Sequence, residues 1–271
     1  MTSARDLANV LEIRDLSFRV GTKEILRNVS FTVRRGEYVS IVGPNGAGKT
    51  TLLKCIDRLL PGGEAAIWVF GRPLGQYTQR ELARRISYVP QGDGRIFPFT
   101  VEEFVLMGRY PYLSPFSSVD AAGRQAVNRA LELTGTRPFA DRRLETLSGG
   151  ERQKVYLAAA LAQQADILLL DEPTTYLDYR HQAEIRDLLA EINRSSGATI
   201  VAVTHDVNRA ALDSHRIVAL RDGQVVFAGL PCEIMQHDVL EAIYGTSFLL
   251  AAHPQAGLPV VLPEPPREVH P

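Results

Sequence analysis

GPNGAGKTT, residues 43–51, fits at every position the pattern G-x-x-x-x-G-K-[ST], in which a glycine-rich loop binds phosphate groups. The apolar residues 38–42 before it predict a buried strand, and residues 51–56 after it begin a helical pattern. This order of strand, loop and helix is the context that the motif requires. The sequence therefore predicts that the chain binds a nucleotide at this turn.

Each residue type in the loop has a predicted task. The glycines allow positive φ and let backbone N–H groups approach phosphate oxygens, while the start of the helix adds a favourable dipole. Lys49 is expected to reach the β- and γ-phosphates, Thr50 to place its hydroxyl on Mg²⁺, and Thr51 to contact the α-phosphate. The residues predicted to bind the nucleotide here are Gly43, Pro44, Asn45, Gly46, Ala47, Gly48, Lys49, Thr50 and Thr51.

Composition describes an ordinary globular protein. The 271 residues are 45% apolar, enough for one large domain or a domain with a subdomain. Thirty basic and 31 acidic residues give a net charge of −1, so the overall charge suggests neither nucleic acid nor an anionic membrane as a partner. The two cysteines lack metal-ligand spacing; we expect reduced thiols, with Cys55 in the core.

No segment of the sequence is apolar over a membrane-spanning length. The longest apolar run, residues 155–162, is far shorter than the roughly 18 residues that a spanning helix needs. We therefore expect that the chain does not cross a membrane by itself. The last 18 residues carry six prolines and are expected to be extended, with a disordered end.

The N-terminal part predicts a pair of antiparallel strands, residues 11–20 and 24–33, joined by a turn near Gly21. Phe18 precedes this turn, where an aromatic ring could stack on an adenine. Alternation along the strand equally explains Phe18 as a core residue.

Residues 66–70 and 86–90 also predict strands, and Gln91 follows the second directly. Pro90 ends that strand, which leaves Gln91 in a loop. From there its amide could reach Mg²⁺ or an attacking water, although a lone loop glutamine is usually solvated.

Residues 100–146 change to helical spacing and predict an inserted helical subdomain, with one apolar face at residues 101–107 and another at 126–133. Residues 108–116 form an aromatic loop broken by prolines. Its aromatic side chains suit either a partner interface or packing onto their own helices.

Two later strands end in polar residues. Residues 167–170 predict a buried parallel strand that delivers Asp171 and Glu172 to one edge of a sheet. Asp171 is expected to hold Mg²⁺ and Glu172 to orient or deprotonate the attacking water. Residues 198–203 predict a second such strand, which ends near His205, a candidate γ-phosphate sensor.

Two further patterns complete the sheet and the phosphate contacts. Leu147-Ser148-Gly149-Gly150-Glu151 opens a helix and offers a second anion site, although many helix starts look like this. Residues 216–220 and 225–228 flank Asp222-Gly223, which indicates a hairpin that closes the sheet.

Taken in this order, the motifs resemble the ATP-binding-cassette (ABC) family across nearly the whole chain. The resemblance identifies Gln91 as the Q-loop, 147–151 as the signature, Asp171 and Glu172 as the Walker B pair, Asp178 as the D-loop and His205 as the switch histidine. It implies an α/β fold: a P-loop NTPase (RecA-like) core, an antiparallel β subdomain and a helical subdomain at about 95–155. The implied ATPase domain is 1–232, followed by a short extension, 233–271.

By this resemblance the catalytic residues are Glu172, His205, Gln91 and Lys49, and the Mg²⁺ ligands are Thr50, Gln91 and Asp171. ATP and Mg²⁺ are the implied cofactors, with Ser148, Gly149, Gly150 and Asp178 also at the nucleotide. Two departures stand out: the family's adenine-stacking aromatic falls on Val20, and Tyr176 is bulky where the D-loop is often small.

The family resemblance implies a head-to-tail homodimer in which the signature of one subunit caps the γ-phosphate held by Lys49 of the other. It implies an ATPase subunit on the cytoplasmic face of the inner membrane, bound to two permease subunits. A GTP-dependent switch is excluded, because no Asn-Lys-x-Asp motif occurs. A soluble cassette ATPase acting on macromolecular assemblies stays open, although the chain has one cassette and balanced charge, and nucleic acid is not an expected partner.

Three segments resemble the cassettes that drive iron-siderophore, haem and cobalamin importers. They are residues 99–111, the Leu-Asp-x-x-His-Gln run at 177–182, and the tail at 248–263. The implied cargo is a metal chelate delivered by an extracytoplasmic binding protein. The alternative is that these segments reflect general cassette packing and that the cargo is different.

Overall fold

The computed structural model describes residues 9–92, 97–114, 118–255 and 257–262. The expected disorder at the chain end falls on residues 263–271, and part of the aromatic loop on 115–117; both lie outside the described residues.

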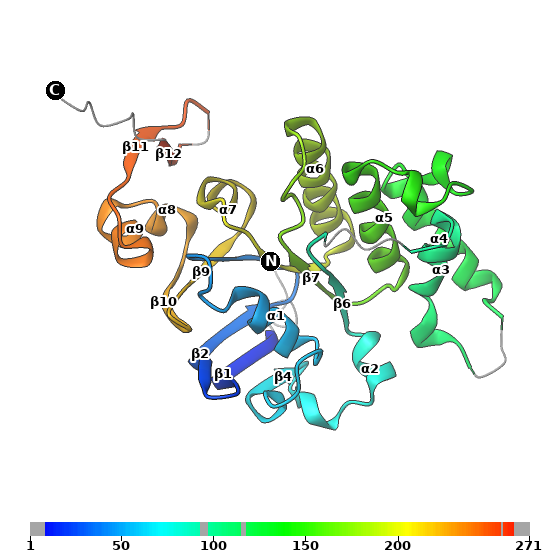
Figure 1. The fold of residues 1–271 in the computed structure, drawn as a ribbon, viewed down its shortest axis with the longest axis horizontal. Coiled ribbons are helices and arrows are strands. Elements are labelled where there is room, and N and C mark those ends of the chain that lie inside the picture. Colours follow the sequence, from blue (N-terminus) through cyan, green and yellow to red (C-terminus); the bar gives the residue numbers. More distant parts are fainter. Residues whose placement is uncertain (1–8, 93–96, 115–117, 256, 263–271) are drawn as a thin grey trace, which may run out of the picture.

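A six-stranded sheet in the order β10-β9-β3-β8-β7-β6 forms the centre (Figure 1). The strands β6, β7, β8, β3 and β9 run parallel, and β10 pairs antiparallel with β9 at one edge. Their bounds are Tyr38–Val42 (β3), Ile86–Val89 (β6), Ile167–Asp171 (β7), Thr199–Val203 (β8), Arg216–Arg221 (β9) and Gln224–Gly229 (β10). The predicted strands and the hairpin at Asp222-Gly223 are thus confirmed, within one or two residues at their ends.

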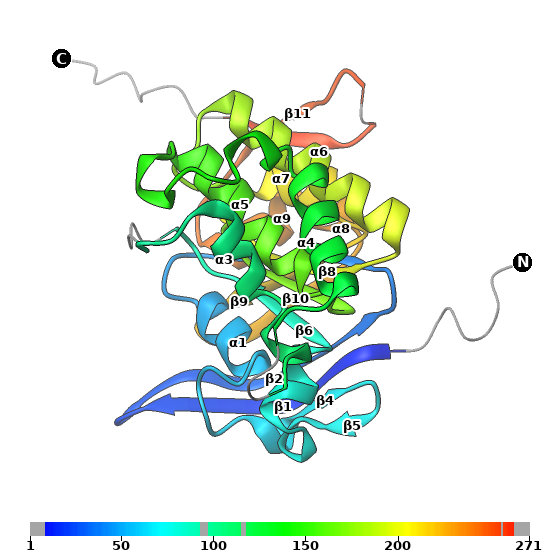
Figure 2. The same cartoon turned by 90° about the vertical axis from the view of Figure 1, so that its right-hand side faces the viewer.

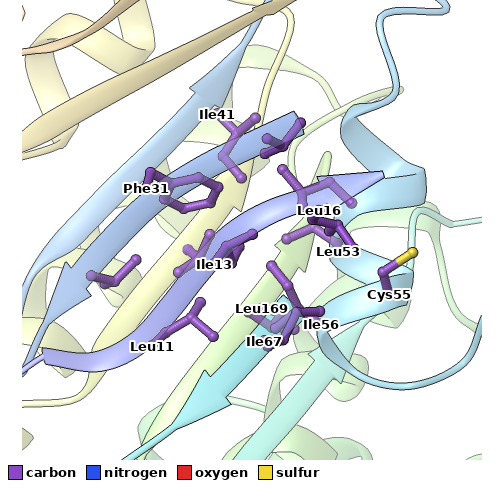
Figure 3. Packing of buried hydrophobic residues seen from close by; sticks show 14 of the residues in the cluster. Leu11, Ile13, Leu16, Phe31, Ile41, Leu53, Cys55, Ile56, Ile67 and Leu169 are labelled. Atoms are coloured by element: carbon purple, nitrogen blue, oxygen red, sulfur yellow. The ribbon is translucent and has the colours of Figure 1, made fainter. Parts of the chain in front are cut away.

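A four-stranded antiparallel sheet, β2-β1-β4-β5, lies beside the central one. Its strands are Asn9–Val20 (β1), Lys23–Arg34 (β2), Ile67–Val69 (β4) and Arg72–Pro73 (β5). Figure 3 shows the core between this sheet and helix α1 (Lys49–Ile56), where Leu16, Leu53 and Ile67 meet. Cys55 is buried in the same cluster, as expected, and both cysteines are free.

Helices cover the other face of the central sheet. They are α3 (Val101–Met107), α4 (Ala121–Leu133), α5 (Gly149–Ala162) and α6 (Tyr179–Ser196), and Figure 2 shows them above the antiparallel sheet. Strand alternation divides the two cores: Ile167 and Leu169 face α1, whereas Leu168 and Leu170 face these helices. Two predicted apolar positions differ, because Met107 and Leu133 end their helices with exposed side chains.

The segment after residue 230 continues the fold. Helices α8 (Pro231–Ile234) and α9 (His237–Tyr244) pack on α7 (Val207–Asp213) through a third apolar cluster that includes Ile234 and Leu240. Strands β11 (Leu249–Ala252) and β12 (Pro259–Leu262) then form a hairpin. Asn208 on α7 holds it by two hydrogen bonds, of 2.9 and 2.7 Å, to the backbone of Val261. The short helix α2 (Gln79–Ala83) precedes β6.

Within the described ranges, every helix is too short or too polar to span a bilayer.

Asp57, directly after α1, provides a test of the packing around that helix. Burial raises the pKa of its carboxyl to about 7, so the folded protein binds this proton more tightly than the unfolded chain does. The protonated carboxyl therefore stabilises the fold relative to the charged one. This contribution to the free energy of unfolding is complete below the ordinary pKa near 4 and is lost as pH rises towards 7. We predict that Asp57→Asn raises the free energy of unfolding over wild type, on the order of 1.4 kcal/mol more for each pH unit between 5 and 7. Urea unfolding at pH 5 and pH 8 measures this; an equal difference at both would contradict it.

Candidate nucleotide-binding site

The phosphate loop turns from β3 into α1 through three glycines in left-handed conformations. Their φ angles are 138° (Gly43), 80° (Gly46) and 98° (Gly48). A Cβ on Gly43 would lie 2.0 Å from the carbonyl oxygen of Leu220, and one on Gly48 would lie 2.7 Å from Leu26. The loop therefore needs glycine for both its conformation and its close packing.

Lys49 begins α1 and is only 6% exposed. Its ammonium donates hydrogen bonds to the carbonyl oxygens of Gly43 (2.7 Å) and Pro44 (2.9 Å). Burial lowers its pKa, and the nearby carboxylates of Glu172 and Asp171 oppose that shift. The ammonium thus lies over the loop whose N–H groups are expected to meet phosphate.

Asp171 ends β7 and is 1% exposed. One carboxylate oxygen accepts a hydrogen bond from the Thr50 hydroxyl (2.9 Å) and the other accepts one from the Tyr88 hydroxyl (3.0 Å). Burial raises the pKa of this carboxyl, and both hydrogen bonds counteract the shift. Sequence reasoning missed Tyr88; its place in the strand just before Gln91 was the available signal.

Three side chains meet the carboxylate of Glu172. Its Oε2 accepts hydrogen bonds from the Gln91 amide (3.0 Å) and the Thr175 hydroxyl (2.8 Å), and it lies 3.5 Å from Nδ1 of His205. Glu172 has a φ of 48°, which is unusual for a residue with a side chain. Its backbone N–H remains tied to Val203 on β8. Thr175 is a second residue that sequence reasoning did not single out.

The signature and the D-loop form a separate group. Ser148 caps α5 in a reciprocal pair with Glu151, and Asp178 caps α6. Among the described residues, no hydrogen bond joins Ser148, Gly149 or Gly150 to the phosphate loop of the same chain. One chain therefore brings Lys49, Thr50, Gln91, Asp171, Glu172 and His205 together and leaves the signature outside that cluster.

The candidate adenine contacts differ in exposure. Phe18 is 9% exposed and packs in the core of the antiparallel sheet, whereas Val20 at the end of β1 is 60% exposed. Tyr176 is 86% exposed and has a φ of 65°.

The aromatic loop shows features of both interpretations of its sequence, packing onto its own chain and exposure to a partner. Pro111 is buried, its carbonyl accepts hydrogen bonds from Arg84, and Arg109 stacks 4.0 Å from the ring centroid of Tyr112. Tyr110 remains exposed beneath Arg80. The loop packs on its own chain and still presents an aromatic surface.

The residues at this edge fit a nucleotide with a divalent cation. The glycine loop leaves open space above Gly46, and the half-buried Thr50 and the buried Asp171 offer oxygen atoms, which Mg²⁺ prefers. In the described part of the chain, no group of three or more His, Cys, Asp or Glu side chains could hold a metal alone.

Comparison with known proteins gives the family. Residues 26–175 match the family model described as ABC transporter. The chain belongs to the ABC transporter family. It is 39% identical to the ferric enterobactin transport ATP-binding protein of Escherichia coli K12, with 92% of each chain covered. It is 40% identical to the hemin import ATP-binding protein of Streptomyces coelicolor, with 92% of this chain and 88% of that one covered.

Comparison with solved structures agrees with the family assignment. The chain superposes on an inward-facing transporter described as metal-chelate type with a TM-score of 0.81 at 25% identity, over 96% of this chain and 99% of that one. It superposes on a dimeric cassette bound to ADP and Pi in a post-hydrolysis state with a TM-score of 0.69 at 29% identity, over 82% and 98%. The expected P-loop NTPase fold is confirmed, and the protein is an ATP-binding ATPase of this family.

Gly43 and Gly46 allow a matched test of the loop. Gly43→Ala adds a Cβ that meets the backbone of Leu220, so we predict a loss of roughly 3 kcal/mol or more in the free energy of unfolding. Gly46→Ala meets open space and should lose only about 1–2 kcal/mol from its positive φ. Urea unfolding compares the two variants. Equal losses would show that packing against Leu220 does not explain Gly43.

Proposed function

We propose that this chain is the ATP-hydrolysing subunit of an importer that takes up a metal chelate, working as a head-to-tail homodimer. The observation that carries the hydrolytic part is the convergence of Gln91, Thr175 and His205 on one oxygen of Glu172, beside Lys49 and Asp171. Phosphoryl transfer requires a positioned nucleophile and stabilised charge, and this edge of the sheet supplies groups for both.

Glu172 orients the attacking water and accepts its proton. Gln91, Thr175 and His205 fix the direction of the carboxylate, and His205, which leaves the adjacent strand, senses the γ-phosphate. The ammonium of Lys49 exchanges its two loop carbonyls for β- and γ-phosphate oxygens when ATP binds, while Thr51 contacts the α-phosphate.

Thr50, Asp171 and Gln91 would hold Mg²⁺, which would supply positive charge to neutralise the phosphate oxygens. Of the two candidates for contact with adenine, Val20 is favoured over Phe18, because the Val20 side chain is exposed at the end of β1.

The site is completed by a second subunit. Ser148 caps α5, and the backbone N–H groups of Gly149 and Gly150 in its first turn have no carbonyl partner one turn earlier in the helix, which suits a γ-phosphate. Because this group is not hydrogen-bonded to its own phosphate loop, it serves the loop of a partner chain, with Asp178 at the same interface. Loss of the γ-phosphate removes those bonds and opens the dimer.

The cargo assignment rests on the relatives. Two relatives that match nearly the whole length of this chain, at 39% and 40% identity, are named for the transport of ferric enterobactin and the import of hemin. On this basis the dimer binds two permease subunits at the cytoplasmic face of the inner membrane, and they receive the chelate from an extracytoplasmic binding protein. A cassette ATPase of another transporter, or one acting on soluble assemblies, is the alternative.

Glu172→Gln tests the hydrolytic role. The amide keeps the shape of the side chain but cannot accept a proton, so we predict that ATP binding persists while turnover falls at least about a hundredfold. The variant should accumulate an ATP-bound dimer, detected by gel filtration with and without ATP. Hydrolysis within a few-fold of wild type would show that Glu172 is not the base.

Deletion of the gene tests the cargo. Uptake of labelled ferric siderophore, haem and cobalamin is measured in the deletion strain, with the wild-type gene and the Lys49→Ala gene restored separately. We predict that uptake of at least one chelate is lost and that only the wild-type gene recovers it. Unchanged uptake of all three, in a strain without a redundant system, would contradict the cargo assignment and leave the ATPase role intact.

A further inference from the structure

His181, in the first turn of α6, contacts both halves of the signature and D-loop group. Its ring lies against Gly150 so closely that a Cβ there would be 2.2 Å from the ring atom Cδ2. Its Nδ1 lies 2.8 Å from Oδ1 of Asp178, and its backbone N–H donates to the same oxygen at 2.8 Å. One side chain thus joins the start of α5 to the residue that caps α6.

The His181 ring has a defined orientation between these two contacts. A carboxylate only accepts hydrogen bonds, so Nδ1 carries the hydrogen, and the opposite edge of the ring faces Gly150. Leu177 lies near Gly149 at a looser distance, with Cδ2 3.9 Å from where a Cβ would stand. The segment 177–181 therefore lies against the signature, most closely at Gly150.

A second link between the same helices lies one turn further along. Lys154 on α5 forms an ion pair with Glu184 on α6, and Arg180 also contacts Glu184. Figure 1 shows α5 and α6 side by side. This link fixes the helix pair without touching the signature or Asp178, which makes it a matched control.

We propose that His181 is a positioning residue that holds the signature and Asp178 at one fixed separation, so that both reach the partner's nucleotide together when the dimer closes. The inference rests on the proposed head-to-tail dimer. Without the ring, the ion pair one turn further along would still hold the two helices, but the contact between the start of α5 and the D-loop would be lost, and closure would have to order these two segments. His181 lies outside the cluster around Glu172, so the binding of ATP to one subunit does not depend on it.

The test compares His181→Ala with His181→Asn, whose amide can replace the Nδ1 hydrogen bond. A hydrogen bond to a charged acceptor is worth enough to change kcat about tenfold, so the alanine variant should lose about that factor in kcat. The asparagine variant should lose at most half as much in log kcat as the alanine variant does. The Kd of the monomer for ATP should stay within about twofold in both. Lys154→Ala should lower Tm without a matching loss of kcat.

Dimer formation separates this inference from the proposed function. In the Glu172→Gln background, added His181→Ala should raise the ATP concentration needed for dimerisation by about tenfold. If Glu172→Gln alone does not dimerise with ATP, the proposed function fails. If it dimerises and the double variant does so equally well, the role of His181 is overturned. An asparagine variant as impaired as alanine, or a Lys154→Ala variant with the same loss of kcat, would also overturn it.

Discussion

A buried carboxylate is stable only when its oxygens are satisfied, and the nucleotide site depends on how this is achieved for Asp171. One oxygen is bound by Thr50 at the start of α1 and the other by Tyr88 on β6. These partners come from both sides of β7, so the carboxylate joins the phosphate loop to the strand that leads into Gln91. The parallel pairing of β6 with β7, of β7 with β8 and of β8 with β3 is the constraint that brings them to one edge.

Much of this edge could be predicted from the sequence, because its parts are local patterns. Apolar runs that end in polar residues predict three of its elements: the phosphate loop, the strand before Asp171 and the strand before His205. The contacts of Tyr88, Thr175 and His181 could not be predicted, since each depends on how segments distant in sequence are brought together. Phe18 shows the same limit: alternation allowed stacking or burial, and only packing decides between them.

Two of the residues that combine a side chain with a positive φ lie between the nucleotide site and the D-loop. Glu172, the proposed catalytic residue, and Tyr176, in the D-loop segment, both have positive φ. Such conformations persist where the surroundings fix them, here Val203 and Thr175 beside Glu172 and the capped start of α6 after Tyr176. In the proposed dimer, a change at Glu172 can therefore be passed along the five intervening residues to Asp178 and, through His181, to the signature.

The central claim is that each nucleotide site is shared between two chains, and mixing two inactive variants tests it most directly. Lys49→Ala disables the phosphate loop and Ser148→Arg disables the signature, so each homodimer should be inactive. In a mixed dimer one site carries both defects and the other carries neither. The account predicts recovered ATPase activity, up to roughly a quarter of wild type for equal mixing, because half of the dimers are mixed and each has one intact site. No recovery, with mixed dimers demonstrated by co-purification through a tag on one variant, would contradict it.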